Sequence, residues 1–148
     1  MSIVLSKIVP WGRSFPEYQL MFNLSEDELN KSILGCGDGT ASFNCEMTSL
    51  GYRVISVDPI YVFSKEQIRK QIEDTYETII SQVKQNQQNF VWKYHLDPDT
   101  LGKNRLATME KFLADYDAGC SENRYQQQAL PSLSFSDNQF DLALCSHL

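Results

Sequence analysis

The stretch SILGCGDGTASFN, residues 32–44, decides how the fold of this chain is read. A short apolar run leads into three alternating glycines, Gly35, Gly37 and Gly39. Glycine destabilises the interior of a strand or a helix, so three together indicate a turn that needs positive φ or a close approach to the backbone. We therefore expect a strand that ends in a glycine-rich turn.

The residues that follow this turn predict a helix and then a second strand. Phe43, Met47 and Leu50 are spaced four and three apart, as on one face of a helix, and Gly51 is a suitable stop. The segment YRVISVDP, residues 52–59, is rich in β-branched residues and ends at an Asp-Pro pair. A strand, helix and strand in this order predict a parallel sheet with a right-handed crossover.

Short elements precede this unit, and a helical region follows it. We expect a helix over 16–22 and one helical turn capped by Ser25, with Glu28 completing a capping box. A long helix should begin after Ser64, and a second should span 104–116 with Asp99 or Thr100 as its cap. The apolar stripe of the long helix predicts core packing and comprises Ile68, Ile72, Ile79, Ile80 and Val83.

The C-terminal part of the chain offers two more strands. Residues 124–130 are polar, which favours a weak edge strand, whereas FDLALCSHL, residues 140–148, is a strong strand candidate. A sheet of this type normally continues beyond such a strand. We therefore expect the chain to be the N-terminal portion of a longer protein, with C-terminal strands missing and self-association through the terminal strand as one consequence.

Length and composition favour a single domain, residues 1–148, with a real core. The apolar content is 42%, and no run approaches the ~18 apolar residues of a membrane helix. The N-terminus lacks the layout of a signal peptide, so we expect a cytoplasmic protein without a membrane partner. The formal charge of −6 argues against nucleic acid as a partner. The irregular spacing of the four cysteines favours buried thiols over disulfides or zinc.

The glycine turn and Asp58 together indicate a site for a nucleoside. The turn presents backbone N–H groups, and the carboxylate lies about 19 residues after Gly39, a spacing that suits hydrogen bonds from two ribose hydroxyls. A dinucleotide site has the pattern GxGxxG, but its third glycine is replaced here by Thr40. The pattern GxGxG favours a ligand without a pyrophosphate.

At this point the sequence resembles class I S-adenosylmethionine-dependent methyltransferases over about residues 30–148. LGCGDGT is similar to their first motif, VISVDP to their second strand with its ribose-binding acid, and LSFSDNQFDLALCSHL to the approach to their fourth strand. The resemblance implies a three-layer, Rossmann-like α/β fold with a parallel sheet, helices on both faces and a helical insertion over residues 64–118. It also implies methyl transfer from S-adenosylmethionine to an acceptor that the sequence does not identify.

The resemblance assigns roles to residues at the carboxyl ends of the strands. The glycines would line the methionine and ribose, Asp58 would hold the ribose hydroxyls, and the residues after it would flank the adenine. His147 is a candidate base near the methyl group, although a structural or substrate-shaping role competes with catalysis. The cofactor-binding residues implied are Gly35, Cys36, Gly37, Gly39, Asp58, Pro59, Ile60, Ala129, Leu130, Cys145 and Ser146.

The sequence departs from the family pattern at two positions. Family members usually carry an acid two positions before the first glycine, where this chain has Ile33, and an acid near the adenine, where it has Ala129. These departures favour one alternative, a non-catalytic or truncated nucleoside-binding domain. An NAD-dependent oxidoreductase is a further alternative.

Three remaining features have competing interpretations. Cys36 lies between two of the glycines and is more typical of a small packed residue than of a nucleophile. His95 lies near Asp97 and Asp99, but one histidine with two loop carboxylates predicts no metal site. Residues 1–30, with Trp11 among them, could form a lid over the site or a strap along the sheet edge.

Overall fold

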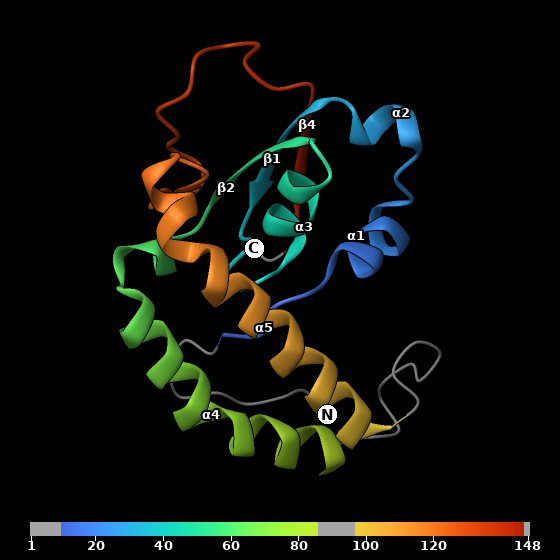
Figure 1. Cartoon of the computed structure of the whole chain (residues 1–148), viewed down its shortest axis with the longest axis vertical. Helices are drawn as coiled ribbons and strands as arrows, with labels where there is room; N and C mark the ends of the chain where they lie inside the picture. The colour runs from blue at the N-terminus through green and yellow to red at the C-terminus, as the bar shows by residue number, and fades with distance from the viewer. Residues whose placement is uncertain (1–9, 86–96, 147–148) are drawn as a thin grey trace.

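The computed structural model describes residues 10–85 and 97–146 (Figure 1). The chain is an α/β protein whose helices pack on one four-stranded sheet. Its elements in chain order are α1 (Phe15–Phe22), α2 (Glu26–Leu29), β1 (Ser32–Cys36), α3 (Phe43–Ser49), β2 (Arg53–Val57), the 3₁₀ helix η1 (Pro59–Val62), α4 (Lys65–Gln85), α5 (Pro98–Ser121), β3 (Tyr125–Gln126) and β4 (Leu142–Cys145).

All four strands are parallel and lie in the order β3-β2-β1-β4. The expected strand, helix and strand are confirmed as β1, α3 and β2, with Ser32 opposite Arg53 and Cys36 opposite Val57. On its other side β1 pairs with β4, which places Cys145 opposite Cys36. The residues that end β1, β2 and β4 therefore meet at one edge of the sheet.

The two faces of the sheet are covered differently. Ile33, Val54 and Leu144 face α3, where they pack with Phe43 and Met47, both fully buried. α1 adds to this layer, because the ring of its Tyr18 stacks on that of Phe43 with centroids 4.3 Å apart. The opposite face, which includes Leu34, Cys36 and Val57, is covered by side chains of the connection between β3 and β4, namely Leu133, Phe135 and Phe140.

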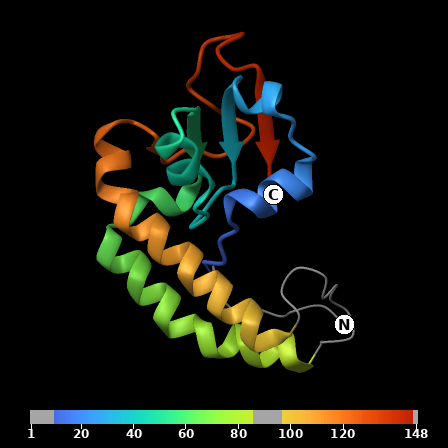
Figure 2. The ribbon, with the colours of Figure 1, turned by 45° about the vertical axis from the view of Figure 1, so that its right-hand side comes forward.

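α4 and α5 form a helical hairpin that extends away from the sheet (Figures 1 and 2). Ser64 caps α4 as expected, since its hydroxyl accepts from the N–H of Gln67 at 3.2 Å. The predicted isoleucine and valine stripe is confirmed as buried. A core of aromatic and aliphatic side chains joins the hairpin to the sheet and consists of Ile60, Tyr61, Ile68, Ile72, Met109, Phe112, Leu113, Tyr116 and Tyr125.

Several expected boundaries are corrected by the structure. α5 spans 98–121, longer at both ends than the predicted 104–116, and its cap is Asp97 rather than Asp99 or Thr100. The Asp97 carboxylate accepts from the N–H of Thr100 at 2.8 Å, and Pro98 follows it in the first turn, where its missing N–H costs nothing. The polar strand shrinks from 124–130 to 125–126. Leu50 is 60% exposed because α3 ends at Ser49, before it.

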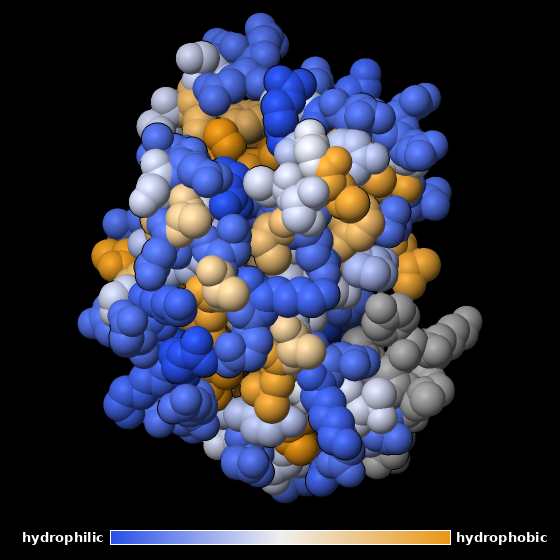
Figure 3. Space-filling model, in the orientation of Figure 1, coloured by the Kyte–Doolittle hydropathy of each residue, from blue (hydrophilic) through white to orange (hydrophobic). Residues whose placement is uncertain are grey.

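The surface over the helices is mainly hydrophilic, with apolar side chains in the seams between them (Figure 3). Hydrophobic atoms are also recessed beneath the connection that leads to β4. A cavity of about 300 Å³ lies at this end of the strands, lined in part by Ile33, Val54 and Phe140. Across the described ranges 10–85 and 97–146, no helix has the length and apolar character needed to cross a bilayer.

Candidate functional site

The glycine-rich turn leaves β1 and crosses the end of the sheet before α3 begins. Gly37 and Gly39 have φ of 75° and 52°, the left-handed region that glycine adopts without steric cost. The N–H of Gly37 donates to the carbonyl oxygen of Val57 at 2.9 Å, so the turn is fastened to the last residue of β2. The expectation that these glycines serve positive φ is confirmed for both.

Gly35 instead allows a side chain to pack closely against the backbone. A Cβ added there would lie 1.9 Å from Oδ2 of Asp38, so the missing side chain makes room for a carboxyl group. Asp38 is 3% exposed, and burial raises its pKa to about 6 even though hydrogen bonds from Ser56 and Tyr18 oppose the shift. The sequence reasoning passed over Asp38, and the signal that could have found it is its place between two glycines.

A chain of buried hydrogen bonds holds the Asp38 carboxyl group. The hydroxyl of Tyr18 donates to Oδ1 at 2.8 Å, and that of Ser56 donates to Oδ2 at 2.5 Å. Behind Ser56, the amide of Asn44 donates to the serine hydroxyl at 3.0 Å. The carboxyl group therefore joins α1, α3, β2 and the glycine turn, elements that are separate in the sequence.

The end of β4 belongs to the same network. The hydroxyl of Ser146 lies 3.0 Å from that of Tyr18 and donates to the carbonyl oxygen of Gly37 at 3.1 Å. The N–H of Ser146 donates to the carbonyl oxygen of Cys36 at 3.3 Å. The sequence-predicted residues Cys36, Gly37 and Ser146 are thus brought together, with Tyr18, a residue of the N-terminal segment expected to form a lid or a strap, as their neighbour.

Asp58 reaches back to the glycine turn. Its Oδ2 accepts from the N–H of Gly39 at 2.9 Å, and its Oδ1 accepts from the N–H of Ile60 at 2.9 Å. Partial burial raises the pKa of this carboxyl group, and the two backbone hydrogen bonds oppose the shift. Tyr61 braces the turn from the same 3₁₀ helix, because its hydroxyl donates to the carbonyl oxygen of Gly39 at 2.8 Å.

A cavity of about 530 Å³ opens beside Asp58. Its size falls within the range of roughly 300–1,000 Å³ that is usual for small-ligand sites. Its walls come from the ends of β1 and β2 and from the segment after β3, so three separate parts of the chain build it. The residues that line it are Cys36, Gly37, Val57, Asp58, Pro59, Gln128, Ala129, Leu130 and Pro131.

The predicted site residues divide into three groups around this cavity. Cys36, Gly37, Asp58, Pro59, Ala129 and Leu130 line it. The other described ones lie close by in the network or in the core: Gly35 beneath Asp38, Gly39 and Ile60 bonded to Asp58, and Cys145 and Ser146 at the end of β4. His147 lies outside the described residues, as does His95.

The cavity wall carries an amide side chain besides the carboxylate of Asp58. Gln128 is one lining residue that the sequence reasoning did not select. Its amide is engaged on both sides, since Nε2 donates to Gln126 at 2.9 Å and Oε1 accepts from the N–H of Ser134 at 2.7 Å. These bonds shape the segment after β3 into a wall. Ile33 is 1% exposed and packs under α3, so its side chain contributes to the core.

The N-terminal segment lies against the glycine turn from the α3 side. The carbonyl oxygen of Arg13 accepts from the N–H of Ser42, the residue before α3, at 3.0 Å. A Cβ added at Gly12 would meet the carbonyl oxygen of Thr40 at 2.2 Å, so the two backbones touch. Trp11 packs with the α4 and α5 core. Whether the segment serves as a lid or as a strap stays a prediction.

Within residues 10–85 and 97–146, no three His, Cys, Asp or Glu side chains gather where they could hold a metal ion. Asp97, one of the two carboxylates near position 95, caps α5 instead.

Comparison with known proteins adds one relative. The chain is 32% identical over 144 residues to an uncharacterized protein of Methanocaldococcus jannaschii. The match covers 97% of this chain and 64% of the relative, so the chain spans less than two thirds of that protein's length. No family model matches the sequence. No solved structure matches it either.

Proposed function

We propose that the chain binds S-adenosylmethionine at the carboxyl ends of β1, β2 and β4 and takes part in methyl transfer to an acceptor. The observation that carries this proposal is the placement of Asp58. Its carboxylate bonds to Gly39 of the glycine turn and also lines the cavity of about 530 Å³. A nucleoside whose ribose faced Asp58 would have its base between the residues after β2 and those after β3.

The residues present fit such a ligand. Each oxygen of Asp58 accepts one backbone N–H, and a carboxylate has about four lone-pair sites, so two remain for ribose hydroxyls. Pro59, Ala129 and Leu130 give the adjoining wall an apolar character suited to an adenine ring. The positive φ of Gly37 and Gly39 allows the backbone itself to approach the ligand.

The start of α3 favours this cofactor over a dinucleotide. A pyrophosphate normally accepts hydrogen bonds from backbone N–H groups where the turn enters the helix. Here the N–H of Ser42 already donates to Arg13, and the backbone at Gly12 lies against Thr40. The N-terminal segment therefore occupies the position at the start of α3 where a pyrophosphate would bind.

S-adenosylmethionine, when bound, supplies a methyl group on a positively charged sulfur, which an acceptor displaces in line. The chain's own residues would bind this cofactor and orient it toward the acceptor. Asp58 would hold the ribose, and the Ser146 hydroxyl keeps the end of β4 against Gly37. Alignment of this kind supplies much of the rate in a displacement that needs no strong base. We propose His147 as the candidate base, from its sequence position alone.

The finer fold assignment belongs to the same proposal. A Rossmann-like methyltransferase has helices on both faces of the sheet and further strands beyond the fourth. The side of the sheet with Leu34, Ala143 and Cys145 is where a second helical layer would pack, and Ala143 and Cys145 are exposed there. α4 and α5 would then be an insertion between the second and third strands.

Isothermal titration with S-adenosylhomocysteine tests the binding, with NAD titrated in parallel. We expect binding that weakens at least tenfold in Asp58→Asn, because one acceptor of the ribose hydroxyls is replaced by a donor. Asp141→Asn is the matched control. Its carboxylate accepts from the N–H of Ser32 at 2.9 Å, at the opposite end of the sheet.

Each outcome decides between the candidate functions. Equal weakening in both variants, or no binding of S-adenosylhomocysteine by a folded chain, would overturn the proposal. Binding of NAD alone would favour an oxidoreductase. Binding without transfer of an isotope-labelled methyl group to any acceptor in a cell extract would favour the non-catalytic alternative.

A further inference from the structure

The last residues of β1 and β4 are both cysteines, and they face each other. Cys36 and Cys145 are direct partners in the parallel register, so their side chains point to the same face of the sheet. Neighbouring strands lie about 4.8 Å apart, which is inside the range of roughly 4.4–6.8 Å between the Cα atoms of disulfide-bonded cysteines.

The two thiols differ in exposure. Cys145 is exposed to solvent, whereas Cys36 is 3% exposed and lies in the wall of the cavity beside Asp58. Burial and the neighbouring Cys145 raise the pKa of Cys36 to about 11, so it stays a protonated thiol at neutral pH. An oxidant from solvent therefore meets Cys145 first, and Cys36 is the nearest group that can react with the product.

We propose that Cys36 and Cys145 form a reversible oxidation site, in which hydrogen peroxide converts the two thiols to a disulfide between β1 and β4. Cys145 attacks the peroxide, becomes a sulfenic acid and releases one water. Cys36 then attacks that sulfur, and its proton leaves with the hydroxyl group as a second water. The two thiols lose two electrons, which the peroxide gains.

The proposed disulfide would lie beside the cavity and change its wall. Both cysteines directly precede groups of the network, since Gly37 begins the glycine turn and Ser146 binds that turn. A disulfide here would fix the two strand ends together and replace the Cys36 thiol in the cavity wall. This inference rests on the strand register and the exposure of the two thiols, and it does not depend on the identity of the ligand.

Thiol titration and peptide mapping of the full chain test the proposal. After treatment with a few equivalents of hydrogen peroxide, we expect the thiols titrated in denaturant to fall by two of the four, and dithiothreitol to restore them. Mass spectrometry should find one peptide pair, joined through positions 36 and 145 and lighter by two hydrogens. Cys145→Ser should abolish the pair, whereas Cys120→Ser, a half-buried cysteine on α5, should leave it unchanged.

A second probe does not require oxidation. Phenylarsine oxide bridges two adjacent thiols, so it should protect both cysteines of the folded chain from alkylation, and either single serine variant should lose this protection. Three results would overturn the proposal: a disulfide between other cysteines or between two chains, oxidation of Cys145 to a sulfinic acid with Cys36 still free, or no arsenical bridge in the folded protein.

Discussion

The carboxyl group of Asp38 occupies the space that a side chain at position 35 would need. This close packing organises the glycine-rich turn. Because Gly35 has no Cβ, the carboxyl group can turn back under the backbone and accept from Tyr18 and Ser56. The glycine-rich motif thus serves the packing of the protein, apart from any role that it has in the proposed binding of a ligand.

Gly35→Ala should destabilise the protein by about 2–4 kcal/mol, since its methyl group would displace the Asp38 carboxyl group and break two buried hydrogen bonds. Urea unfolding measures the change. In an Asp38→Ala background the same substitution should cost clearly less, because the clashing carboxyl group is gone. Strictly additive effects would show that the two positions do not compete for space.

Stability should depend on the titration of Asp38. Its folded pKa of about 6 exceeds the ordinary value of 3.8, so protons bind more tightly to the folded state. The stabilising contribution is complete below about pH 4 and is lost as the pH rises through 6, which amounts to about 3 kcal/mol. Urea unfolding from pH 4 to 7 should show this decline in the wild type relative to Asp38→Asn. A constant difference between the two proteins would contradict it.

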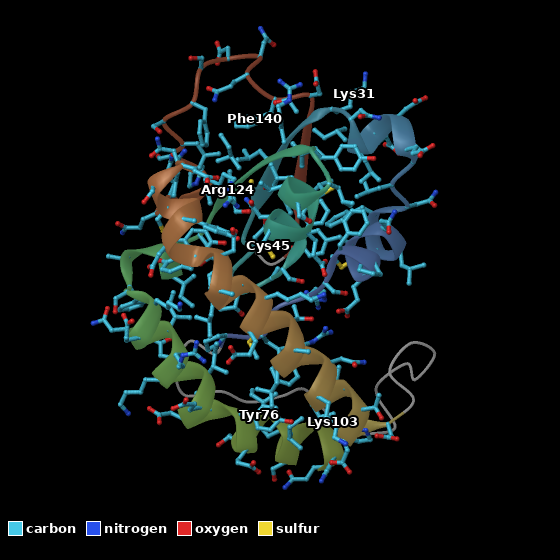
Figure 4. The ribbon with its side chains drawn as sticks, viewed as in Figure 1. Lys31, Cys45, Tyr76, Lys103, Arg124 and Phe140 are labelled. Carbon is cyan, nitrogen blue, oxygen red and sulfur yellow. The ribbon has the colours of Figure 1, made fainter. Side chains whose placement is uncertain are left out.

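At the scale of elements, close approaches at glycines set how α5 packs. Gly102 lies against α4, where an added Cβ would meet the Tyr76 hydroxyl at 2.3 Å and Cδ1 of Ile80 at 2.7 Å. Gly119 lies against β3, where the Cβ would meet the Tyr125 ring at 2.2 Å. Figure 4 shows Tyr76 in the helical hairpin and Arg124 where α5 meets the sheet. The first neighbours are ends of flexible side chains, whereas the second is a buried ring.

Gly119→Ala should therefore cost about 2–3 kcal/mol, because the Tyr125 ring is enclosed by the aromatic core and its hydroxyl bonds to Asp115. Gly102→Ala should change stability by about 1 kcal/mol or less, since the helix propensity of alanine offsets a clash that side-chain ends can relieve. Thermal or urea unfolding of the two variants compares them directly. Equal losses of unfolding free energy in the two variants would show that the Tyr125 ring moves aside as easily as the side-chain ends of Tyr76 and Ile80.

For the whole molecule, the hairpin and the sheet layer are joined by a buried ion pair. Arg105 of α5 donates to both carboxylate oxygens of Glu17 in α1, at 2.6 and 2.7 Å. The two side chains are 7% and 11% exposed, and the guanidinium also lies over the Trp11 ring at 5.8 Å. Segments 88 residues apart are held together here.

Arg105→Ala should destabilise the chain by about 3–5 kcal/mol, because the buried Glu17 carboxylate would lose the guanidinium that offsets its charge, while its hydrogen bonds from Ser14 are neutral. The surface pair Lys70–Asp74, with side chains 73% and 44% exposed, is the control, and Lys70→Ala should cost less than about 1 kcal/mol. Urea unfolding of both variants gives the comparison. Similar small losses would mean that water reaches Glu17 once the arginine is removed.

The sequence by itself determined the elements whose signals are local. The alternation of glycines, the spacing of Phe43 and Met47, and the β-branched second strand predicted the βαβ unit, which is confirmed. The offset of Asp58 indicated a ribose-binding carboxylate, which stays a prediction, and its bond to Gly39 was not foreseen. Such patterns can be predicted from sequence because they depend on residues close together in the chain. They include the periodicity of strands and helices, helix caps and the positive φ that glycine allows. The length of β3 was missed because its pairing with β2 settles it in three dimensions. The start of α5 was missed although its signal is local, since Asp97 rather than Asp99 or Thr100 is the cap.

Only the tertiary structure decided which distant groups meet. The burial of Asp38, its bond to Tyr18 and the facing pair Cys36 and Cys145 depend on packing of α1 and β4 against β1. No local pattern marks such contacts, since a tyrosine on a short helix reads alike whether its hydroxyl reaches solvent or a buried carboxyl group. The sequence therefore predicted which strand ends would meet, and the fold determined which side chains surround the cavity beside Asp58.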